Sequence, residues 1–250
     1  TSGTLLRALG MPFENTGRDR RYFWLGEAAG IVLADALTAR GVDAIPREER
    51  RAAFDRLQVP ATAVLTDATT FRIAQLVGAT HVLVGEFQVE GTTLTVRTRA
   101  IGVEAGVLRG AVAQGGPLGE FFSIFDALSE QAVRVTGLPA RPSSGSGGLA
   151  TASGVAPTLR SGAVPPSVGV LESYTKGVLA EDPRTASRYL DTALQEAPGY
   201  DPARLALRHP ARHAALHELV HLRRHHVGLL LAHRLAQDVR LAQREARQRR

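Results

Sequence analysis

A short run of side chains near the C-terminal end has the spacing of a zinc site. His217 and His221 are four residues apart, and Glu218 follows the first of them in the sequence HELVH. On a helix these two imidazoles share one face, so both could bind a single Zn²⁺ ion. Glu218 would then act as general base on a zinc-bound water, which is the chemistry of metal-assisted peptide hydrolysis.

The surroundings of this run weaken the zinc hypothesis. It resembles zincin metalloproteases in these five residues only, and Arg224 and Val227 occupy the glycine and third-histidine positions of the longer metzincin pattern. Chance also explains the match, because histidine recurs every four residues in this region. A zinc metallopeptidase using His217, Glu218 and His221 is kept as an alternative, and we assign no catalytic, cofactor or metal residue. The recurring histidines are His209, His213, His217, His221 and His225.

The chain's net charge of +6 is concentrated in its last residues. Residues 208–250 hold ten arginines against three acidic residues, whereas residues 1–207 hold twenty basic and twenty-one acidic groups. Nucleic-acid binding through this arginine-rich tail is a second alternative, because guanidinium groups pair with phosphates. We favour a solvated tail without a nucleic-acid partner, since the rest of the chain has no basic excess.

Composition excludes several other kinds of site. The absence of cysteine excludes disulfides and thiolate metal sites. No apolar run reaches the roughly 20 residues that span a bilayer, so no transmembrane segment is predicted. The arginine-containing loop at 15–21 lacks the glycine spacing of a phosphate-binding loop. His81, the one histidine outside the C-terminal region, is interpreted as a packing residue.

The elements that would position any site centre on a predicted antiparallel meander. Glu90-Gly91-Thr92 separates two β-rich runs and supplies a glycine suited to positive φ. From Leu94 to Ala100, apolar residues alternate with polar ones, which predicts one buried and one exposed face. A second turn at Ala105-Gly106 leads into a third strand, predicted at Val107–Ala113.

Residues 1–137 are predicted to form an α/β sandwich in which helices cover a mixed sheet. Strands and helices alternate before the meander, and a further helix follows it. The predicted strands are Thr4–Leu9 and Val42–Ile45, and the predicted helices run from Leu25 to Gly41, Pro46 to Leu57, Thr66 to Gly78 and Pro117 to Gly137.

A change in composition after this part marks the clearest boundary. Residues 138–166 are rich in Gly, Ser and Pro and contain no acidic or aromatic residue, which predicts a flexible linker. Beyond it, apolar spacing predicts an all-α helical hairpin over 167–207, with Pro183 starting its second helix. Such a hairpin cannot bury its apolar face alone and normally stacks on neighbours. Residues 208–250 form a separate basic tail rich in His and Arg.

Short motifs in the first half resemble a known domain family. Pro12-Phe13-Glu14-Asn15, then Gly26 within a helix, then the run from Gly78 to Gly85 follow the order of the TolB amino-terminal-like domain, which is similar to FlgO. The resemblance covers Met11–Gly137, about half of the chain. It implies a bacterial α/β interaction domain without catalytic residues, of a kind found fused to tetratricopeptide repeats and often present in exported or envelope proteins.

Residues 174–203 resemble part of a tetratricopeptide repeat. The second helix has the expected spacing of small, apolar and proline residues, whereas Gly177 lies too close to Ala186 for the usual repeat length. A single repeat lacks the neighbours that complete a binding groove. The positions that fit are Ala186, Leu190, Ala193 and Pro198.

The sequence therefore predicts a non-catalytic protein–protein interaction or scaffold protein. Its α/β domain would dock one protein, and the groove of the tetratricopeptide-like repeat would take a peptide or helix. The expected partner is another protein or a peptide, and neither a cofactor nor a nucleic-acid partner is expected. The resemblance favours a periplasmic or envelope location, with a cytoplasmic one left open. The sequence leaves open the oligomeric state and the presence of an upstream signal peptide.

Overall fold

The computed structural model describes residues 6–17, 19–60, 63–138 and 166–208. The HELVH run, the histidine series and the arginine-rich tail after Arg208 lie outside these described residues. The zinc and nucleic-acid hypotheses therefore stay predictions. The same holds for the linker predicted at 138–166, of which only the two end residues are described.

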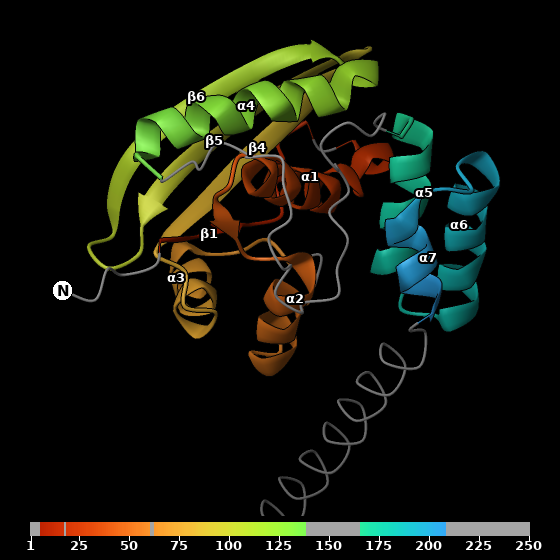
Figure 1. Ribbon diagram of the computed structural model, residues 1–250, viewed down its shortest axis with the longest axis horizontal. Coiled ribbons are helices and arrows are strands. Elements are labelled where there is room, and N and C mark those ends of the chain that lie inside the picture. Colours follow the sequence, from red (N-terminus) through yellow and green to blue (C-terminus); the bar gives the residue numbers. More distant parts are fainter. Residues whose placement is uncertain (1–5, 18, 61–62, 139–165, 209–250) are drawn as a thin grey trace, which may run out of the picture. The chain divides into compact units, whose positions relative to one another are not determined.

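The first part of the chain is built on a mixed sheet in which a parallel half adjoins an antiparallel meander (Figure 1). Its strands are β1 (Arg7–Gly10), β2 (Glu14–Asn15), β3 (Asp43–Ala44), β4 (His81–Glu90), β5 (Thr93–Gly102) and β6 (Val107–Pro117). β1 pairs in parallel with β3 on one side and with β4 on the other, and β2 continues the parallel pairing along β4. β4, β5 and β6 are antiparallel, which gives the order β3-β1-β4-β5-β6.

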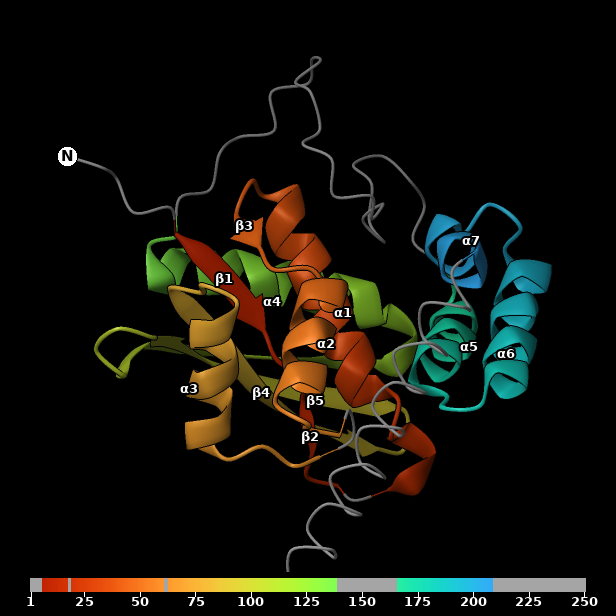
Figure 2. The ribbon, with the colours of Figure 1, turned by 90° about the horizontal axis from the view of Figure 1, so that it is seen from below.

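Helices cover both faces of this sheet. They are α1 (Leu25–Ala39), α2 (Arg47–Arg56), α3 (Asp67–Leu76) and α4 (Phe121–Thr136). α1 and α4 pack together on one face, where α4 lies along β6 (Figure 1). α2 and α3 pack on the opposite face and lie in front of β1 and β4 in Figure 2. The predicted α/β sandwich with a mixed sheet and a meander is confirmed.

The two faces of β5 differ as the alternating sequence predicts. Leu94, Val96 and Ala100 are at most 2% exposed and belong to the core. Arg97 and Arg99 on the other face are exposed. Successive side chains of a strand point to opposite faces of the sheet. A sequence that alternates apolar and polar residues therefore buries one face of the strand and exposes the other to solvent.

The two predicted turns of the meander are also confirmed. Gly91 and Gly106 have φ values of 60° and 62°, which lie in the left-handed region that favours glycine. Each glycine stands between two antiparallel strands of the meander. The local turn chemistry therefore fixed where these strands begin and end.

The last strand is longer than its predicted span of Val107–Ala113. β6 continues to Pro117, and α4 begins only at Phe121 after a short 3-10 turn, η2 (Leu118–Glu120). The backbone N–H of Leu118 donates to Thr92 O at 2.8 Å, so the ladder with β5 extends past Pro117. The sequence pattern did not predict this extension, because its residues are mostly small and do not alternate between apolar and polar.

The strand predicted at Val42–Ile45 is found at the predicted place but is shorter than predicted. Only Asp43 and Ala44 pair with β1, at the outer edge of the sheet, where they are exposed and half-buried. The buried residues of this segment are the flanking Val42 and Ile45. Pro46 was predicted as the first helical residue, but it caps a helix that begins at Arg47.

The helical segment that begins after residue 165 consists of α5 (Val168–Leu179), α6 (Pro183–Glu196) and α7 (Asp201–Arg208). Pro183 starts α6 as predicted, and Asp182 caps it by accepting the backbone N–H of Thr185 at 2.8 Å. A Cβ added at Gly177 would lie 2.8 Å from Leu190 Cγ, so α5 and α6 approach closely at this glycine. The short helix α7 extends the predicted hairpin. None of the helices that the structure describes combines the length and apolar run of a bilayer crossing.

Candidate functional site

A crevice of about 810 Å³ lies beyond the carboxyl end of β1 and over the meander. β1 is followed in sequence by β3 on one side of it and then by β4 on the other. In open α/β sheets such a reversal of strand order is where ligands bind. Phe23 and Val64, which are 52% and 78% exposed, also line the crevice. Its lining from the meander strands includes Val84, Glu86, Arg97, Arg99, Ala111 and Ala113.

The crevice exists because the helices cover the two faces of the sheet unequally. α3 packs on β4, and the core cluster beneath α2 and α3 draws on β1 and β4 rather than on β6. On this face β6 presents the small exposed side chains of Ala111 and Ala113, and Pro117 at its end. None of the helices described in the structure covers this part of the sheet face, and the crevice occupies it.

The charged lining of the crevice is mixed, because the exposed carboxylates of Glu14 and Asp67 stand in it together with Glu86, Arg97 and Arg99. Arg97 Nη1 lies 3.3 Å from Glu86 Oε1, but both side chains are largely exposed, so this ion pair is weak. Arg99 makes no hydrogen bond or ion pair with any residue that the structure describes. Because a guanidinium binds carboxylates through a planar fork of donors, Arg99 is suited to an acidic group of a partner.

A buried ion triad lies at one end of the crevice, where Glu27 belongs to the lining. Glu27 Oε1 accepts from Arg47 Nε and from Arg50 Nη2, each at 2.7 Å. Arg50 also donates to Gly10 O at 2.7 Å, and Arg47 donates to Val178 O at 3.0 Å. The triad therefore connects α1 with α2 and the end of β1, all within the core.

The triad keeps the carboxylate of Glu27 ionised and does not suit proton transfer. Burial alone would raise the pKa of Glu27, but the two arginines outweigh it and hold that pKa below its usual value. A general base works best with a pKa near the working pH. Glu27 is far from that condition, because it stays ionised and both of its neighbours stay attached to it.

His81 was predicted to be a packing residue, and its surroundings agree. The side chain is 8% exposed, and its Nδ1 lies 3.1 Å from Thr80 Oγ1, its one hydrogen-bond partner among the described residues. Burial lowers the pKa of His81, and nearby Arg109 lowers it further. No cluster of three or more His, Cys, Asp or Glu side chains occurs among the residues that the structure describes.

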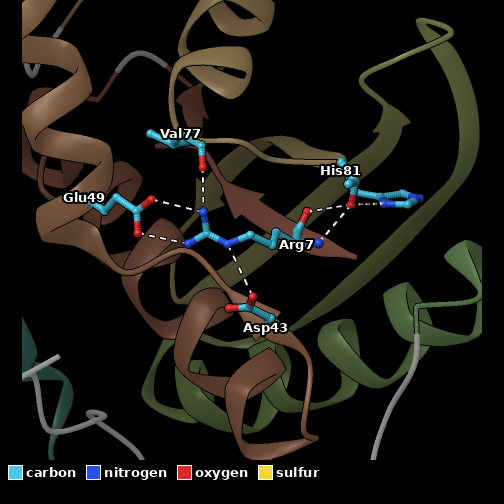
Figure 3. A network of polar contacts seen from close by, with 6 residues as sticks. Arg7, Asp43, Glu49, Val77 and His81 are labelled. Carbon is cyan, nitrogen blue, oxygen red and sulfur yellow. Dashed lines mark hydrogen bonds and ion pairs between the residues drawn. The ribbon is translucent and has the colours of Figure 1, made fainter. Parts of the chain in front are cut away.

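A second polar network, centred on Arg7, lies at the amino end of β1 (Figure 3). Arg7 donates to both carboxylate oxygens of Glu49, at 3.2 and 3.0 Å, and to Val77 O at 2.6 Å. Its Nε lies 3.3 Å from Asp43 Oδ2, and its backbone N–H donates to Thr80 Oγ1 at 2.9 Å. The predicted strand Thr4–Leu9 is found at Arg7–Gly10, and the arginine that interrupts its apolar run joins five elements.

We expect Arg7→Met to lower the free energy of unfolding by about 2 kcal/mol, because it removes charge-assisted bonds and leaves Val77 O without its donor. Urea unfolding monitored by circular dichroism measures this change. The matched control is Arg134→Met, which breaks an exposed pair with Glu130 on α4 and should cost less than about 0.5 kcal/mol. Equal effects of both variants would contradict the assignment of Arg7 as a structural junction.

The motif residues of the predicted family resemblance meet in one packed cluster. Phe13 N–H donates to Gly26 O at 2.9 Å, and a Cβ on Gly26 would lie 2.4 Å from Phe13 O. A Cβ on Gly85 would lie 2.2 Å from the Phe13 ring, which packs edge-on against Phe125 with centroids 5.7 Å apart. The spacing of these motifs therefore encodes close packing between β4, α1 and the segment after β1.

The sequence did not reveal the crevice or the triad. A signal for the triad was present, since Glu27 interrupts the apolar run of α1, and Arg47 and Arg50 are spaced for one face of α2. A buried carboxylate requires such partners. The open meander face carried no equivalent signal, because small residues such as Ala111 fit an exposed strand and a covered one equally well.

Comparisons with known proteins give a distant likeness in fold. No family model and no curated protein matches the chain. The C-terminal domain of LpoB from Escherichia coli has 18% identity over 46% of this chain and 82% of that chain, with a TM-score of 0.36. Lipoprotein GNA1162 from Neisseria meningitidis has 16% identity over 51% and 96%, with a TM-score of 0.36. The PelC dodecamer from Paraburkholderia phytofirmans has 17% identity over 56% and 90%, with a TM-score of 0.32. The TolB-like and tetratricopeptide assignments are not shown by these comparisons.

Proposed function

We propose that this chain is a non-catalytic protein–protein interaction protein. In this proposal the crevice of the α/β domain docks a segment of a partner protein that places an acidic group at Arg99. The helical segment α5–α7 is the start of a tetratricopeptide-like unit that binds a peptide or helix of a second partner. The α/β domain would belong to the TolB amino-terminal-like type, with a periplasmic or envelope location.

The open crevice is the observation that carries this proposal. It combines exposed apolar side chains, Phe23 and Val64, with the guanidinium of Arg99, which pairs with no residue in the described part of the chain. Partner-binding surfaces join apolar anchors and arginine in this way. The buried Glu27 at its end is held by two arginines, and among the described residues the crevice lining contains no serine, cysteine, histidine or lysine.

The role of the helical segment rests on its packing. Leu190 and Ala193 of α6 are buried, and Gly177 allows the close approach of α5. The rings of Tyr174 and Tyr200 meet edge-on with centroids 5.4 Å apart, so α7 is held by a specific contact. Helical repeat units bind through the groove that stacked neighbours form, and a third helix is the beginning of such stacking.

Photo-crosslinking in intact cells tests the docking role of the crevice. Phe23 is replaced by p-benzoylphenylalanine, which preserves the ring, and the matched control carries the same group at Ala52, an exposed position of α2. We expect a discrete adduct with a different protein from position 23 and none from position 52. The same pattern from both positions, or no adduct from either, would overturn the docking role.

The identified partner then allows a quantitative test of Arg99. Arg99→Glu should weaken binding of the purified partner about tenfold or more, because a like charge replaces the donor fork. Arg134→Glu, an exposed arginine on α4, should leave the dissociation constant unchanged. Equal affinities for wild type and Arg99→Glu would remove this arginine from the docking surface.

A further inference from the structure

The outer edge of β6 has no strand beside it in the described part of the chain. β6 ends the sheet order, and Figure 1 shows it as the outermost strand of the meander. Its eleven residues, Val107–Pro117, form a long edge. Unpaired edges are templates for another strand, and natural proteins normally protect them with charges, prolines, bulges or short length.

The hydrogen bonds between β5 and β6 determine which residues of β6 direct their backbone N–H and C=O groups away from β5. Leu118 N–H donates to Thr92 O, so this pair exchanges bonds across the ladder. In antiparallel pairing, every second residue directs its backbone groups to the same neighbour. Residues at even positions from Leu118 back to Val112 therefore direct these groups to β5. The N–H and C=O groups of the residues between them, Ala111, Ala113 and Gly115, point away from β5. These three residues present a regular row of donors and acceptors.

Protection of the edge is confined to its two ends. A register irregularity faces the start of the strand, between Ala100 and Ile101 of β5, and Pro117 stands at the other end. Between them, residues 110–116 have the sequence GAVAQGG, without a charge or a proline. This stretch is free to accept a partner strand, and the two ends set its limits.

The stretch is complementary to itself. Antiparallel pairing about Ala113 sets Ala111 opposite Gly115 of a second copy and aligns the outward-pointing backbone groups with one another. The small side chains avoid a steric conflict. The single charge of β6, on Arg109, falls opposite Pro117, so like charges do not meet. Such pairing supplies roughly six backbone hydrogen bonds.

Exposed apolar side chains stand beside the same edge. Val107, Leu108 and Val135 are 50%, 55% and 41% exposed, and they are three of the exposed large hydrophobic residues in the described chain. Val135 of α4 packs over Gly110 of β6, where a Cβ would lie 2.6 Å from it. A copy paired along this edge would bring its own α4 near the patch and remove apolar surface from water.

We propose that β6 is a homodimerisation edge, along which two copies of this chain pair antiparallel about Ala113 into one continuous sheet. The interface is isologous, since each copy contributes the same strand. The proposal goes beyond the docking function of the crevice and does not depend on it. Charge neutrality and self-complementarity of GAVAQGG favour a second copy over a peptide from another protein.

Cysteine trapping of the full chain tests the pairing, because the natural sequence has no cysteine. In a paired strand the two Cα atoms at position 113 would be about 5.5 Å apart, which suits a disulfide. We expect Ala113→Cys to form a covalent dimer under mild oxidation. Ala52→Cys, at the exposed position on α2, should stay monomeric at the same concentration.

Sedimentation equilibrium provides the second measurement. The wild-type chain should show twice the monomer mass, and Ala113→Lys should shift it to the monomer by placing two ammonium groups opposite each other. Ala52→Lys should remain dimeric. A monomeric wild type, an undisturbed dimer in Ala113→Lys, or capture of Ala113→Cys only by a different protein would each overturn the proposal. If Ala113→Lys does not fold, the disulfide trapping of Ala113→Cys decides whether β6 pairs with a second copy.

Discussion

Replacing Glu27 with Gln is expected to lower the free energy of unfolding by about 3–5 kcal/mol. Glu27 Oε1 is the common acceptor of Arg47 and Arg50, and all three side chains are at most 8% exposed. The variant keeps the volume and an oxygen acceptor but removes the negative charge. Two guanidinium groups would then face each other in the core without an anion between them. Urea unfolding of both proteins at neutral pH measures the difference.

The pH dependence of this difference identifies charge as the cause. Because its two arginines hold the folded pKa of Glu27 below the ordinary value of 4.5, Glu27 adds stability above that value. This contribution disappears as the pH falls through the lower folded pKa. The stability gap between the wild type and Glu27→Gln should therefore begin to shrink as the pH falls below 4.5 and close only below the lower folded pKa. A gap that stays constant with pH would assign the loss to packing.

Two further variants separate the triad from a general loss of carboxylates. Glu130→Gln removes an exposed carboxylate that pairs with Arg134 on α4, and its effect should stay below about 0.5 kcal/mol. Replacing Glu27, Arg47 and Arg50 together with Met should recover most of the stability, because a complete apolar replacement leaves no uncompensated charge. A triple variant no better than Glu27→Gln would contradict this account.

Features that rest on local chemistry could be predicted from the sequence. The turn at Gly91 and the alternation from Leu94 to Ala100 depend only on neighbouring residues, and the structure has both. The start of α6 at Pro183 is of the same kind. The α/β sandwich followed from the order of these elements, since an alternation of strands and helices has few compact solutions.

Features that rest on distant contacts could not be predicted. Arg7 lies in the predicted strand Thr4–Leu9, and it binds groups 36 to 73 residues away in the sequence, from Asp43 to Thr80. The four residues from Gln114 to Pro117 have no alternating pattern that predicts a strand. They are extended because they pair with β5. The crevice depends on which strands the helices leave uncovered, and the sequence of one segment alone does not predict this.

The crevice and the proposed dimer edge lie in adjoining parts of the meander. The crevice takes its floor from the open face of the meander, and the dimer would use the outer edge of β6. Ala111 and Ala113 belong to both, because their side chains line the crevice while their backbone groups point outward. A dimer about Ala113 would set two crevices side by side on one sheet, so a partner with two docking segments would bind it more tightly than a monomer.

Gly85→Ala is expected to destabilise the fold by about 3 kcal/mol, because the added methyl group would overlap the ring of Phe13. The new Cβ would lie 2.2 Å from a ring carbon, well inside contact distance. The ring has little room to yield, since it is 5% exposed and packs against Phe125, which stacks on Phe121 at 4.6 Å. Thermal and urea unfolding measure the loss.

A smaller side chain at position 13 tests the cause of that loss. In a Phe13→Leu background, Gly85→Ala should cost much less, so the double-mutant cycle should give a coupling of about 1–2 kcal/mol. Gly119→Ala is the matched control, because its Cβ would meet nothing within 4 Å, and it should be neutral. Additive effects of the two substitutions would contradict a direct contact between the two motifs. Strong coupling would show that the sequence signature shared by Phe13 and Gly85 reflects close packing between two residues that also line the crevice.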